Sequence, residues 1–449
     1  MSQPQTTGRY LVLLEDDAMD AGMSAISNST GVKDLAQSRD FADSAVTPQA
    51  LGGTDGVVFN ELGVAVITLH GDQIQSLNRE AAHSPAIIAI EPERVVYAIS
   101  EPSYGRGMRL FPTFQPTPSA QSAVNPSMDY LKGYRDAINQ LVDHLLGGNP
   151  QNEVVVDGAL PPTVLDPAFT WGLQYTGVNS SPYSGLGIRV AVLDTGFDLT
   201  HPDFEGRGVM SKSFIEGQEV QDGNGHGTHC IGTACGPQSP STQPRYGVAY
   251  NAQIYAGKVL SDEGSGEDGG ILAGIDWAIA NGCRIISMSL GAPVQQGQSY
   301  SKVYERVGRR ALRRNTLIIA AAGNDSWRSN NLIVPVSHPA NCPSIMAVAA
   351  LDSKLQIATF SNGGLNPRGG QIDIAAPGVD VYSAWPMPTR YNVISGTSMA
   401  TPHVAGIAAL MAEATEASGR DLWAELMLAA KRLPLSSRDV GSGLVQAPE

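Results

Sequence analysis

Four glycine-containing stretches of the chain hold side chains that together could perform nucleophilic chemistry. In chain order they are VAVLDTG with Asp194, GHGTHCIG with His226, AAAGN with Asn324 and GTSMATPHVAG with Ser398. A serine hydroxyl becomes a good nucleophile when an imidazole accepts its proton, and a carboxylate can fix the tautomer of that imidazole and stabilise its cation. A carboxamide N–H group can donate a hydrogen bond to a developing oxyanion. These residue types predict Ser398 as the nucleophile, His226 as its base and Asp194 as the orienting carboxylate.

Each of these motifs alone also has another interpretation. The DTG sequence at Asp194 suits an aspartic protease, but that chemistry needs a second such loop or a homodimer, and no second DTG or DSG occurs. His226 and His229 could share a helix face and bind zinc, although HEXXH-type sites space the histidines four residues apart around a glutamate. Ser398 and Asn324 could each be an ordinary turn residue. Only the four stretches together favour nucleophilic catalysis.

The elements that must position these residues are apolar strands that alternate with helices from about residue 160 onward. The strands are predicted over 188–196, 253–260, 284–291, 316–324 and 344–351, and helical patterns cover 269–282 and 301–315. Near-continuous apolar runs are typical of parallel strands that are buried on both faces. We expect an α/β domain with a doubly wound, mostly parallel sheet, whose functional side chains gather at the carboxyl ends of the strands.

The N-terminal part of the chain has a different pattern. Residues 9–100 read as β-α-β-β-α-β with an insertion near 43–56, a small ferredoxin-like α+β plan. Residues 101–127 contain five prolines and no periodicity, and an amphipathic helix that we expect to dock on a partner surface follows over 128–148. The predicted organisation is a domain over 1–100, a linker with a helix over 101–159, and a larger domain over 160–449.

Composition excludes several classes of protein. The net charge is −14 and the pI about 5.0, which argues against nucleic acid as a partner. The sequence has no apolar stretch long enough to span a membrane. No basic segment followed by an apolar one opens the chain, so we expect a cytoplasmic protein, or one exported by another route or after loss of its signal. Four cysteines match no disulfide scaffold, and we expect mostly free thiols.

The motifs VAVLDTGFDLTHPDF, GHGTHCIGTACG, SMSLGAP, AAAGN and GTSMATPHVAG resemble, in order, the signatures of the subtilisin-like serine peptidases. The resemblance covers about 160–449. It implies that Asp194, His226 and Ser398 form a catalytic triad, and that Asn324 and the Ser398 backbone N–H form an oxyanion hole. It also implies that a substrate strand lies between two rims and against a small-residue wall. One rim is Ser289, Leu290 and Gly291, the other is Gly264, Ser265 and Gly266, and the wall includes Ala321 and Gly323.

The resemblance carries further expectations. Cys230 resembles a free cysteine that lies beneath the catalytic histidine in some branches of the family. Asp203 matches a calcium ligand of many family members, and such a calcium ion would be structural. The loop over 236–249, however, does not match the companion ligand loop of the family. Residue 337 lies near the floor of the pocket for the side chain before the scissile bond. The N-terminal domain resembles an inhibitory propeptide whose last strand enters the cleft, with a cleavage point near Ile99 or Ser100.

The residues on both sides of one rim, Asp262, Glu263, Glu267 and Asp268, are acidic. They predict a preference for basic side chains at the second to fourth positions before the scissile bond.

Taken together, the sequence predicts a serine endopeptidase made as a self-processing zymogen. We expect a monomer that needs no cofactor for catalysis and whose partners are polypeptide substrates and its own propeptide. The alternatives are a catalytically silent binding protein with a permanently docked N-terminal domain, and a maturation peptidase of narrow scope.

Overall fold

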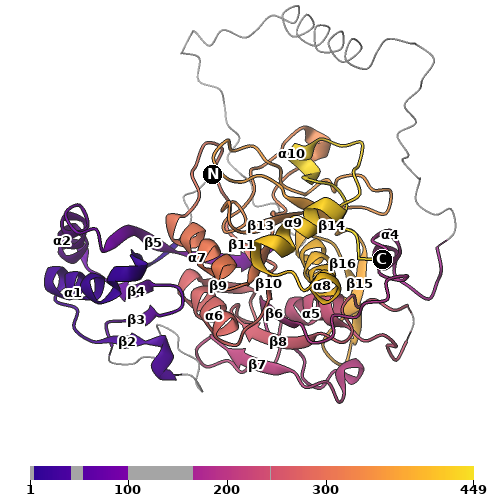
Figure 1. Cartoon of the computed structure of the whole chain (residues 1–449), viewed down its shortest axis with the longest axis horizontal. Helices are drawn as coiled ribbons and strands as arrows, with labels where there is room; N and C mark the ends of the chain where they lie inside the picture. The colour runs from indigo at the N-terminus through magenta and orange to yellow at the C-terminus, as the bar shows by residue number, and fades with distance from the viewer. Residues whose placement is uncertain (1–4, 42–53, 100–164, 243) are drawn as a thin grey trace, which may run out of the picture. The chain divides into compact units, whose positions relative to one another are not determined.

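The computed structural model describes residues 5–41, 54–99, 165–242 and 244–449, and all of these belong to one compact unit (Figure 1). The predicted linker over 101–159, with its helix over 128–148, lies outside the described residues, as does Ser100. The proposed domain boundaries therefore stay a prediction. We use the name N-terminal segment for residues 5–41 and 54–99.

The centre of the larger part is a parallel sheet, as the apolar runs predict. Among the described residues it has seven strands in the order β14-β13-β12-β10-β6-β8-β7, and each neighbouring pair is parallel. The strands are β6 (Arg189–Asp194), β7 (Met210–Ser213), β8 (Gln253–Lys258), β10 (Ile285–Met288), β12 (Leu317–Ala321), β13 (Met346–Leu351) and β14 (Ile374–Pro377). The sequence analysis missed β7 and β14, which have only four residues each.

Helices cover both faces of this sheet. They are α5 (His226–Cys235), α6 (Asp268–Ala280), α7 (Lys302–Arg313), α8 (Thr397–Thr415) and α9 (Gly419–Ala429). Figure 1 shows α6 and α7 on one side of the strands and α5 and α8 on the other. Side chains alternate along a strand, and β6 follows this rule: Val190 and Val192 share an apolar cluster with α5 and α8, whereas Ala191 shares one with α6 and α7. The predicted doubly wound α/β fold is confirmed.

Smaller elements complete this part of the chain. They are α4 (Trp171–Tyr175), α10 (Ser437–Val440), the hairpin β15 (Val381–Ala384) and β16 (Tyr391–Ile394), and the two short strands β9 (Ser265–Glu267) and β11 (Leu290–Gly291). All four cysteines are buried and free. Among the described residues, no helix combines the length and apolar character that crossing a bilayer requires.

The N-terminal segment has the predicted α+β order with one additional short strand. Its elements are β1 (Thr6–Leu14), α1 (Met19–Thr30), β2 (Leu35–Gln37), β3 (Gly56–Phe59), β4 (Val64–Thr68), α2 (Gly71–Ala81) and β5 (Ile87–Ala98). The strand order is β5-β1-β4-β3-β2, in which the short β2 extends the sheet parallel to β3. The pairs β1–β4, β1–β5 and β3–β4 are antiparallel, as in a ferredoxin-like sheet.

Strand β5 joins the N-terminal segment to the rest of the molecule. Beyond its pairing with β1, it pairs antiparallel with β9 and with β11. Its carboxylates also reach two helix starts: Glu93 accepts a hydrogen bond from Gly269 N–H of α6, and Glu91 accepts one from Lys302 N–H of α7. Negative charge at a helix N-terminus is favourable because the first N–H groups of a helix have no intrahelical acceptor.

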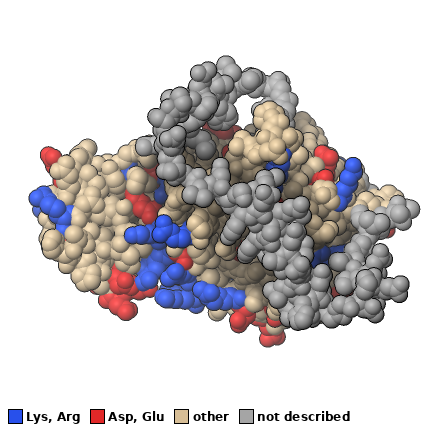
Figure 2. Space-filling view, turned by 90° about the horizontal axis from the view of Figure 1, so that it is seen from above, with Lys and Arg blue, Asp and Glu red and all other residues tan. Residues whose placement is uncertain are grey.

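Arginines of α7 make a second set of contacts with the N-terminal segment. Figure 2 shows basic side chains gathered on one face of the molecule with acidic side chains beside them. Arg306 pairs with Glu15 at 2.5 Å, and Arg310 pairs with Asp16 and donates to the carbonyl oxygen of Leu14 at 2.8 Å. An acidic protein therefore concentrates positive charge at the place where its own acidic segment docks.

Candidate active site

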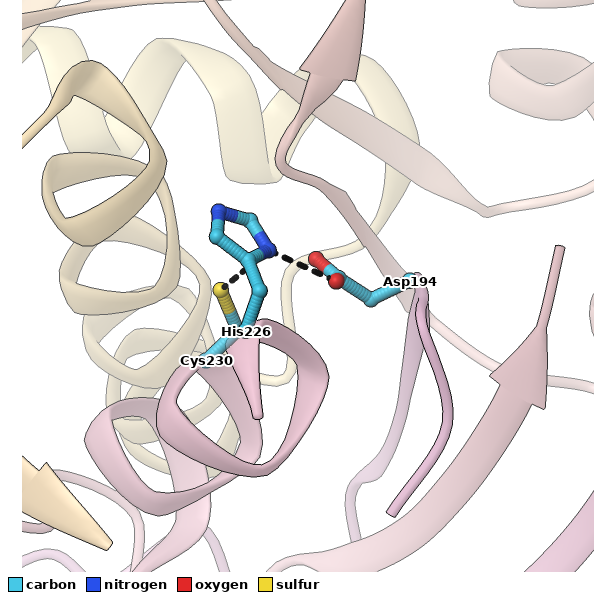
Figure 3. Close-up of side chains that lie close together, drawn as sticks. All are labelled: Asp194, His226 and Cys230. Atoms are coloured by element: carbon cyan, nitrogen blue, oxygen red, sulfur yellow. Dashed lines mark hydrogen bonds and ion pairs between the residues drawn. The ribbon is translucent and has the colours of Figure 1, made fainter. Parts of the chain in front are cut away.

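Asp194 is the last residue of β6, at the carboxyl end of a strand inside the parallel sheet. Its side chain is buried, and its Oδ1 accepts hydrogen bonds from Nδ1 of His226 at 2.7 Å and from the backbone N–H of Thr195 at 2.8 Å (Figure 3). Carboxyl ends of neighbouring parallel strands meet at one edge, which is where doubly wound sheets carry their sites. The end of β6 thus positions the Asp194 carboxylate against the His226 imidazole.

His226 is the first residue of α5, and the glycines on both sides of it are required by space. A Cβ at position 225 would lie 2.4 Å from the ring of Trp385, and a Cβ at position 227 would lie 2.3 Å from the carbonyl oxygen of Gly196. Gly225 also has a φ of 105°, in the left-handed region that favours glycine. The GHG sequence therefore lets the helix that carries the imidazole approach the loop after β6.

The electrostatics of His226 follow from its burial and from its partner. Burial is the largest single effect and would lower its pKa, but the negative charge of Asp194, the hydrogen bond to Asp194 and the neighbouring Cys230 together hold the pKa well above its ordinary value. Cys230 lies one turn further along α5, with its Sγ 3.9 Å from Nδ1 of His226 (Figure 3), as the sequence analysis expected. Burial raises the pKa of the Cys230 thiol to about 11, so this group is protonated at neutral pH.

Ser398 lies in the first turn of α8, and a proline four residues later shapes that turn. Pro402 has no N–H to donate to the carbonyl of Ser398, as a regular helix would require. This carbonyl instead accepts hydrogen bonds from Ser289 Oγ at 2.8 Å and from the Cys230 thiol at 3.5 Å. Side chains from two distant motifs thus hold the turn that presents the Ser398 hydroxyl.

Asn324 follows β12, and its orientation is fixed by a neighbour on α8. Its Oδ1 accepts hydrogen bonds from the backbone N–H and the hydroxyl of Thr397, both at 2.9 Å. Because both of these groups donate, the carbonyl end of the amide faces Thr397 and the NH₂ end faces the opposite way. That NH₂ group donates to the carbonyl oxygen of Ile99 at 3.1 Å.

The carbonyl oxygen of Ile99 is where these groups converge. It also accepts a hydrogen bond from Ser398 Oγ at 2.7 Å, so Ser398 and Asn324 contact one acyl oxygen together. The structure brings Asp194 to His226, but Nε2 of His226 is buried and has no hydrogen-bond partner among the described residues. The predicted hydrogen bond between His226 and Ser398 is therefore not made in this arrangement.

The two predicted rims each pair with one edge of β5. Tyr97 and Val96 are opposite Ser265 and Gly266 of β9, while Ala98 is opposite Leu290 of β11. Hydrogen bonds at the end of the strand extend this pairing: Ala98 N–H donates to the carbonyl of Gly264 at 2.8 Å, and Ile99 N–H to that of Ser289 at 3.2 Å. Gly291 completes β11 opposite Tyr97. The segment before Ile99 is thus held as the middle strand of three.

The side chain of Ile99 lies close to Gly291 of one predicted rim. A Cβ at Gly291 would be 3.1 Å from Cδ1 of Ile99 and 3.4 Å from Cβ of Ser337, which puts Ser337 beside this pocket. Ala321 and Gly323 lie at the end of β12 just before Asn324, and Gly323 has no room for a side chain because Asn362 and Ser337 Oγ fill that space. That Ala321 and Gly323 contact substrate stays a prediction.

The acidic rim is different from what the sequence suggested. Asp268 is fully buried, and its carboxylate accepts hydrogen bonds from Arg94 N–H at 3.0 Å and lies 3.2 Å from His338 Nε2. Asp262 pairs with the buried Lys258 at 2.6 Å, and Glu267 pairs with Arg9. A cation accompanies most of these carboxylates in the described structure, but Arg9 and Arg94 belong to the N-terminal segment, so a preference for basic side chains along this rim stays a prediction.

The histidine pair does not form a zinc site. His229 donates from Nε2 to the carbonyl of Val381 at 2.9 Å, and burial lowers its pKa to about 3. A different group of potential ligands, Asp194, His226 and Cys230, lies within 4.8 Å among the described residues. This group suits a resident metal poorly, since Nδ1 of His226 is already hydrogen-bonded to Asp194.

The surroundings of Asp203 do not fit calcium. Its oxygens accept hydrogen bonds from Ser241 Oγ at 2.6 Å, Tyr246 Oη at 2.7 Å and Tyr391 Oη at 3.0 Å, and the guanidinium of Arg390 lies 3.5 Å away. Burial would raise the pKa of Asp203, but the hydrogen bonds from these hydroxyls outweigh it and hold the pKa below its ordinary value. Calcium needs oxygen acceptors, whereas every neighbour named here donates. The groups around Asp203 in the described structure therefore do not fit a calcium ion, and we do not propose calcium there.

We expect the variant Asp203→Asn to lose stability in a calcium-independent way. Its hydroxyl donors lose a charged acceptor, which costs about 1–3 kcal/mol of the free energy of unfolding. Thermal melts of the unchanged protein and the variant, each with excess calcium and with excess chelator, test this. The difference in Tm between calcium and chelator should be the same for both proteins. If calcium raises the Tm of the unchanged protein but not that of Asp203→Asn, calcium does bind at this site.

Sequence reasoning missed Asp222, which holds the start of α5. Its Oδ2 accepts from the N–H and hydroxyl of Thr228 at 2.8 and 2.7 Å, and its Oδ1 accepts from Gly225 N–H at 2.8 Å and Thr195 Oγ1 at 2.9 Å. One buried carboxylate thus ties the helix that carries His226 to the loop that follows Asp194. The sequence signal is weak, because Asp222 stands three residues before the N-cap position of α5, which is Gly225.

The parallel sheet, with an aspartate, a histidine and a serine on β6, α5 and α8, defines a subtilisin-like fold and site. The model of the Subtilase family matches residues 185–443, and the chain belongs to this family. It is 41% identical to Subtilisin E of Bacillus subtilis over 239 residues, which are 53% of this chain and 59% of that protein. It is also 41% identical to an alkaline protease of Alkalihalobacillus alcalophilus over 253 residues, covering 56% and 61% of the two chains.

A third relative, Subtilisin DY of Bacillus licheniformis, is 41% identical over 236 residues, which are 52% of this chain and 80% of that protein. The chain thus spans about three fifths of the length of the first two relatives. The family model begins at residue 185, so it does not reach the N-terminal segment.

Proposed function

We propose that this protein is a serine endopeptidase made as a self-processing zymogen. The observation that carries the proposal is the carbonyl oxygen of Ile99, which accepts hydrogen bonds from Ser398 Oγ at 2.7 Å and from Asn324 Nδ2 at 3.1 Å. A hydroxyl and a fixed amide donor on one acyl group form the geometry that acyl transfer requires. Membership of the Subtilase family supports the same chemistry.

In the proposed reaction the proton of the Ser398 hydroxyl moves to Nε2 of His226 as Oγ bonds to the acyl carbon. The carbonyl oxygen becomes an oxyanion that Asn324 Nδ2 and the Ser398 N–H stabilise; that N–H lies in the first turn of α8, where helix N–H groups have no intrahelical acceptor. Asp194 stabilises the imidazolium, which then protonates the leaving amine as the C–N bond breaks. Water repeats these steps on the acyl-enzyme and releases the acid. Nε2 of His226 has a free position for this proton in the described arrangement.

The N-terminal segment is the proposed inhibitor of the same site. Its strand β5 occupies the cleft between β9 and β11, with the carbonyl of its last described residue, Ile99, at Ser398. A peptide that ends there is the product of cleavage after Ile99 and blocks the entry of another substrate. The contacts of Glu91 and Glu93 with the starts of α7 and α6 support a stable complex after cleavage.

The test is covalent modification of Ser398. We expect phenylmethylsulfonyl fluoride to abolish hydrolysis of a generic peptide by the processed protein, in proportion to the label found on Ser398 by mass spectrometry. Full activity after stoichiometric labelling would contradict the proposed nucleophile. If the protein hydrolyses no peptide even after the N-terminal segment has been removed, it is a silent binding protein instead.

A further inference from the structure

The register of β5 defines a position that lies beyond the part of the cleft described above. If cleavage follows Ile99, Val95 is the fifth residue before the scissile bond, and it is opposite Glu267 in the β5–β9 pair. Directly opposed residues of an antiparallel pair point their side chains to the same face. The side chain at the fifth position therefore lies next to the Glu267 side chain.

A cavity of about 260 Å³ opens beside this pair. Val95 and Glu267 both line it, and its other lining residues include the apolar Phe214 and Ile215, Gly270 and the exposed acidic Glu216. A Cβ at Gly270 would meet only Phe214 O, at 3.7 Å, so this wall leaves room. The short side chain of Val95 leaves the cavity open, and a longer side chain at this position would enter it.

The charge at this cavity is set by an arginine of the N-terminal segment. The guanidinium of Arg9 pairs with Glu267, and its Nε donates to Glu93 at 2.6 Å. Arg9 and Glu93 both belong to the N-terminal segment and depart with it, whereas Glu216 and Glu267 remain. Removal of the segment thus takes a guanidinium away from Glu267 and leaves two carboxylates at a cavity with an apolar wall.

We propose that this cavity is a substrate subsite that takes an arginine or lysine five residues before the scissile bond. The aliphatic stem of such a side chain would lie along Phe214 and Ile215, and its cationic head would take the place of Arg9 at Glu267. The inference rests on the proposed function, because it needs cleavage at the acyl position of Ile99. It narrows the preference for basic side chains that the whole acidic rim suggested to the fifth position before the scissile bond, with Glu267 as the main carboxylate.

Other charges near the cavity do not oppose this assignment. Lys258 is buried and paired with Asp262, and Lys212 lies over the ring of Phe214 with its Nζ 5.6 Å from the ring centroid. Asp268 follows Glu267 directly but is turned inward to Arg94 and His338. Glu267 and Glu216 are therefore the carboxylates that face an incoming cation.

The experiment compares peptides of the form X-Val-Tyr-Ala-Ile-p-nitroanilide, with X as arginine, methionine or valine, on the processed enzyme. Arginine should raise kcat/KM about twofold to fivefold over methionine of similar length, the range of a partly exposed ion pair, and added salt should shrink this ratio. In the variant Glu267→Gln the ratio should fall to near one. The matched control Glu219→Gln removes an exposed carboxylate that does not line the cavity and should keep the ratio.

The ratio of the kcat/KM values of two peptides, measured on one enzyme preparation, does not change when part of the protein is unfolded. An equal ratio in the unchanged enzyme and in Glu267→Gln would overturn the subsite. Hydrolysis of no peptide by any of the three enzymes would instead contradict the proposed endopeptidase function.

Discussion

Replacement of Ser398 by alanine should leave the 449-residue chain uncut, whereas we expect the unchanged protein to be cleaved after Ile99. Ser398 Oγ lies 2.7 Å from the carbonyl oxygen of Ile99, and alanine removes the atom that would attack this acyl group. Loss of the serine nucleophile lowers turnover by about 10⁶-fold in this class of chemistry. Intact-mass measurement and N-terminal sequencing should show a chain that begins at Ser100 for the unchanged protein and none for Ser398→Ala.

The kinetics of this cleavage provide an independent check. The segment and the site are tethered in one chain, so self-cleavage should be first order, with a half-time that does not change on dilution. Thr415→Ala is the matched control, because it removes a hydroxyl near the other end of α8. That variant should be processed at the normal rate. Processing of purified Ser398→Ala, or a half-time that lengthens on dilution, would contradict cleavage by Ser398 within the same chain.

The second large effect is expected from Asp194→Asn, which should lower kcat by about 10⁴-fold with little change in KM. The carboxylate of Asp194 accepts the Nδ1 hydrogen of His226 at 2.7 Å and so keeps Nε2 free to take a proton. An asparagine can present an N–H group there instead, which favours the wrong tautomer of the imidazole. Steady-state kinetics of the processed enzyme measure both constants. The variant should be activated by added unchanged enzyme, since it cannot process itself at a useful rate.

The same variant should change the pH dependence in a defined direction. Asp194 raises the pKa of His226 well above its ordinary value, and only the neutral imidazole can accept the Ser398 proton. Activity of the unchanged enzyme is therefore lost as the pH falls through this raised pKa. Without the negative charge of residue 194 the pKa of His226 falls, so the residual activity of Asp194→Asn should persist to lower pH.

Asp198→Asn is the control for a buried carboxylate on the same loop. Asp198 accepts hydrogen bonds from Met387 N–H at 2.8 Å and Thr200 Oγ1 at 2.7 Å and makes no contact with His226 in the described structure. Its replacement should lower Tm but leave kcat within a few-fold. An equal loss of kcat in both variants would mean that Asp194 acts through stability rather than through the imidazole.

The parts of this molecule that sequence predicts well are those with local physical causes. Continuous apolar runs predict β6, β8, β10, β12 and β13, because strands buried on both faces need apolar side chains throughout. The glycines beside His226 indicate a close approach of other groups to this turn, because a side chain at either position would have no room. The motifs also predict that Asp194 meets His226, since both follow from strand ends and helix starts.

What sequence does not reveal depends on partners far away in the chain. Asp268 reads as a solvent-exposed rim residue, yet its carboxylate meets Arg94 and His338, which are 174 and 70 residues distant. Asp203 reads as a calcium ligand, but Tyr391, 188 residues later, donates to it. Such pairs are made by the tertiary fold, and neither residue of a pair carries a local pattern that names the other.

Glu91 and Glu93 affect how long the N-terminal segment stays bound but not which peptide bonds the cleft accepts, because their carboxylates contact helix starts rather than the cleft. They precede Ile99 by eight and six residues along an extended strand, so they contact the molecule about 20–26 Å from the acyl group. A short peptide product makes the same backbone pairs with β9 and β11 but lacks these remote anchors. We therefore expect the cleft alone to set the residence time of such a product, whereas the N-terminal segment is also held by the first turns of α6 and α7 and by arginines of α7. Substitutions at those helix starts would therefore change the duration of the proposed inhibition without changing which peptide bonds the enzyme cuts.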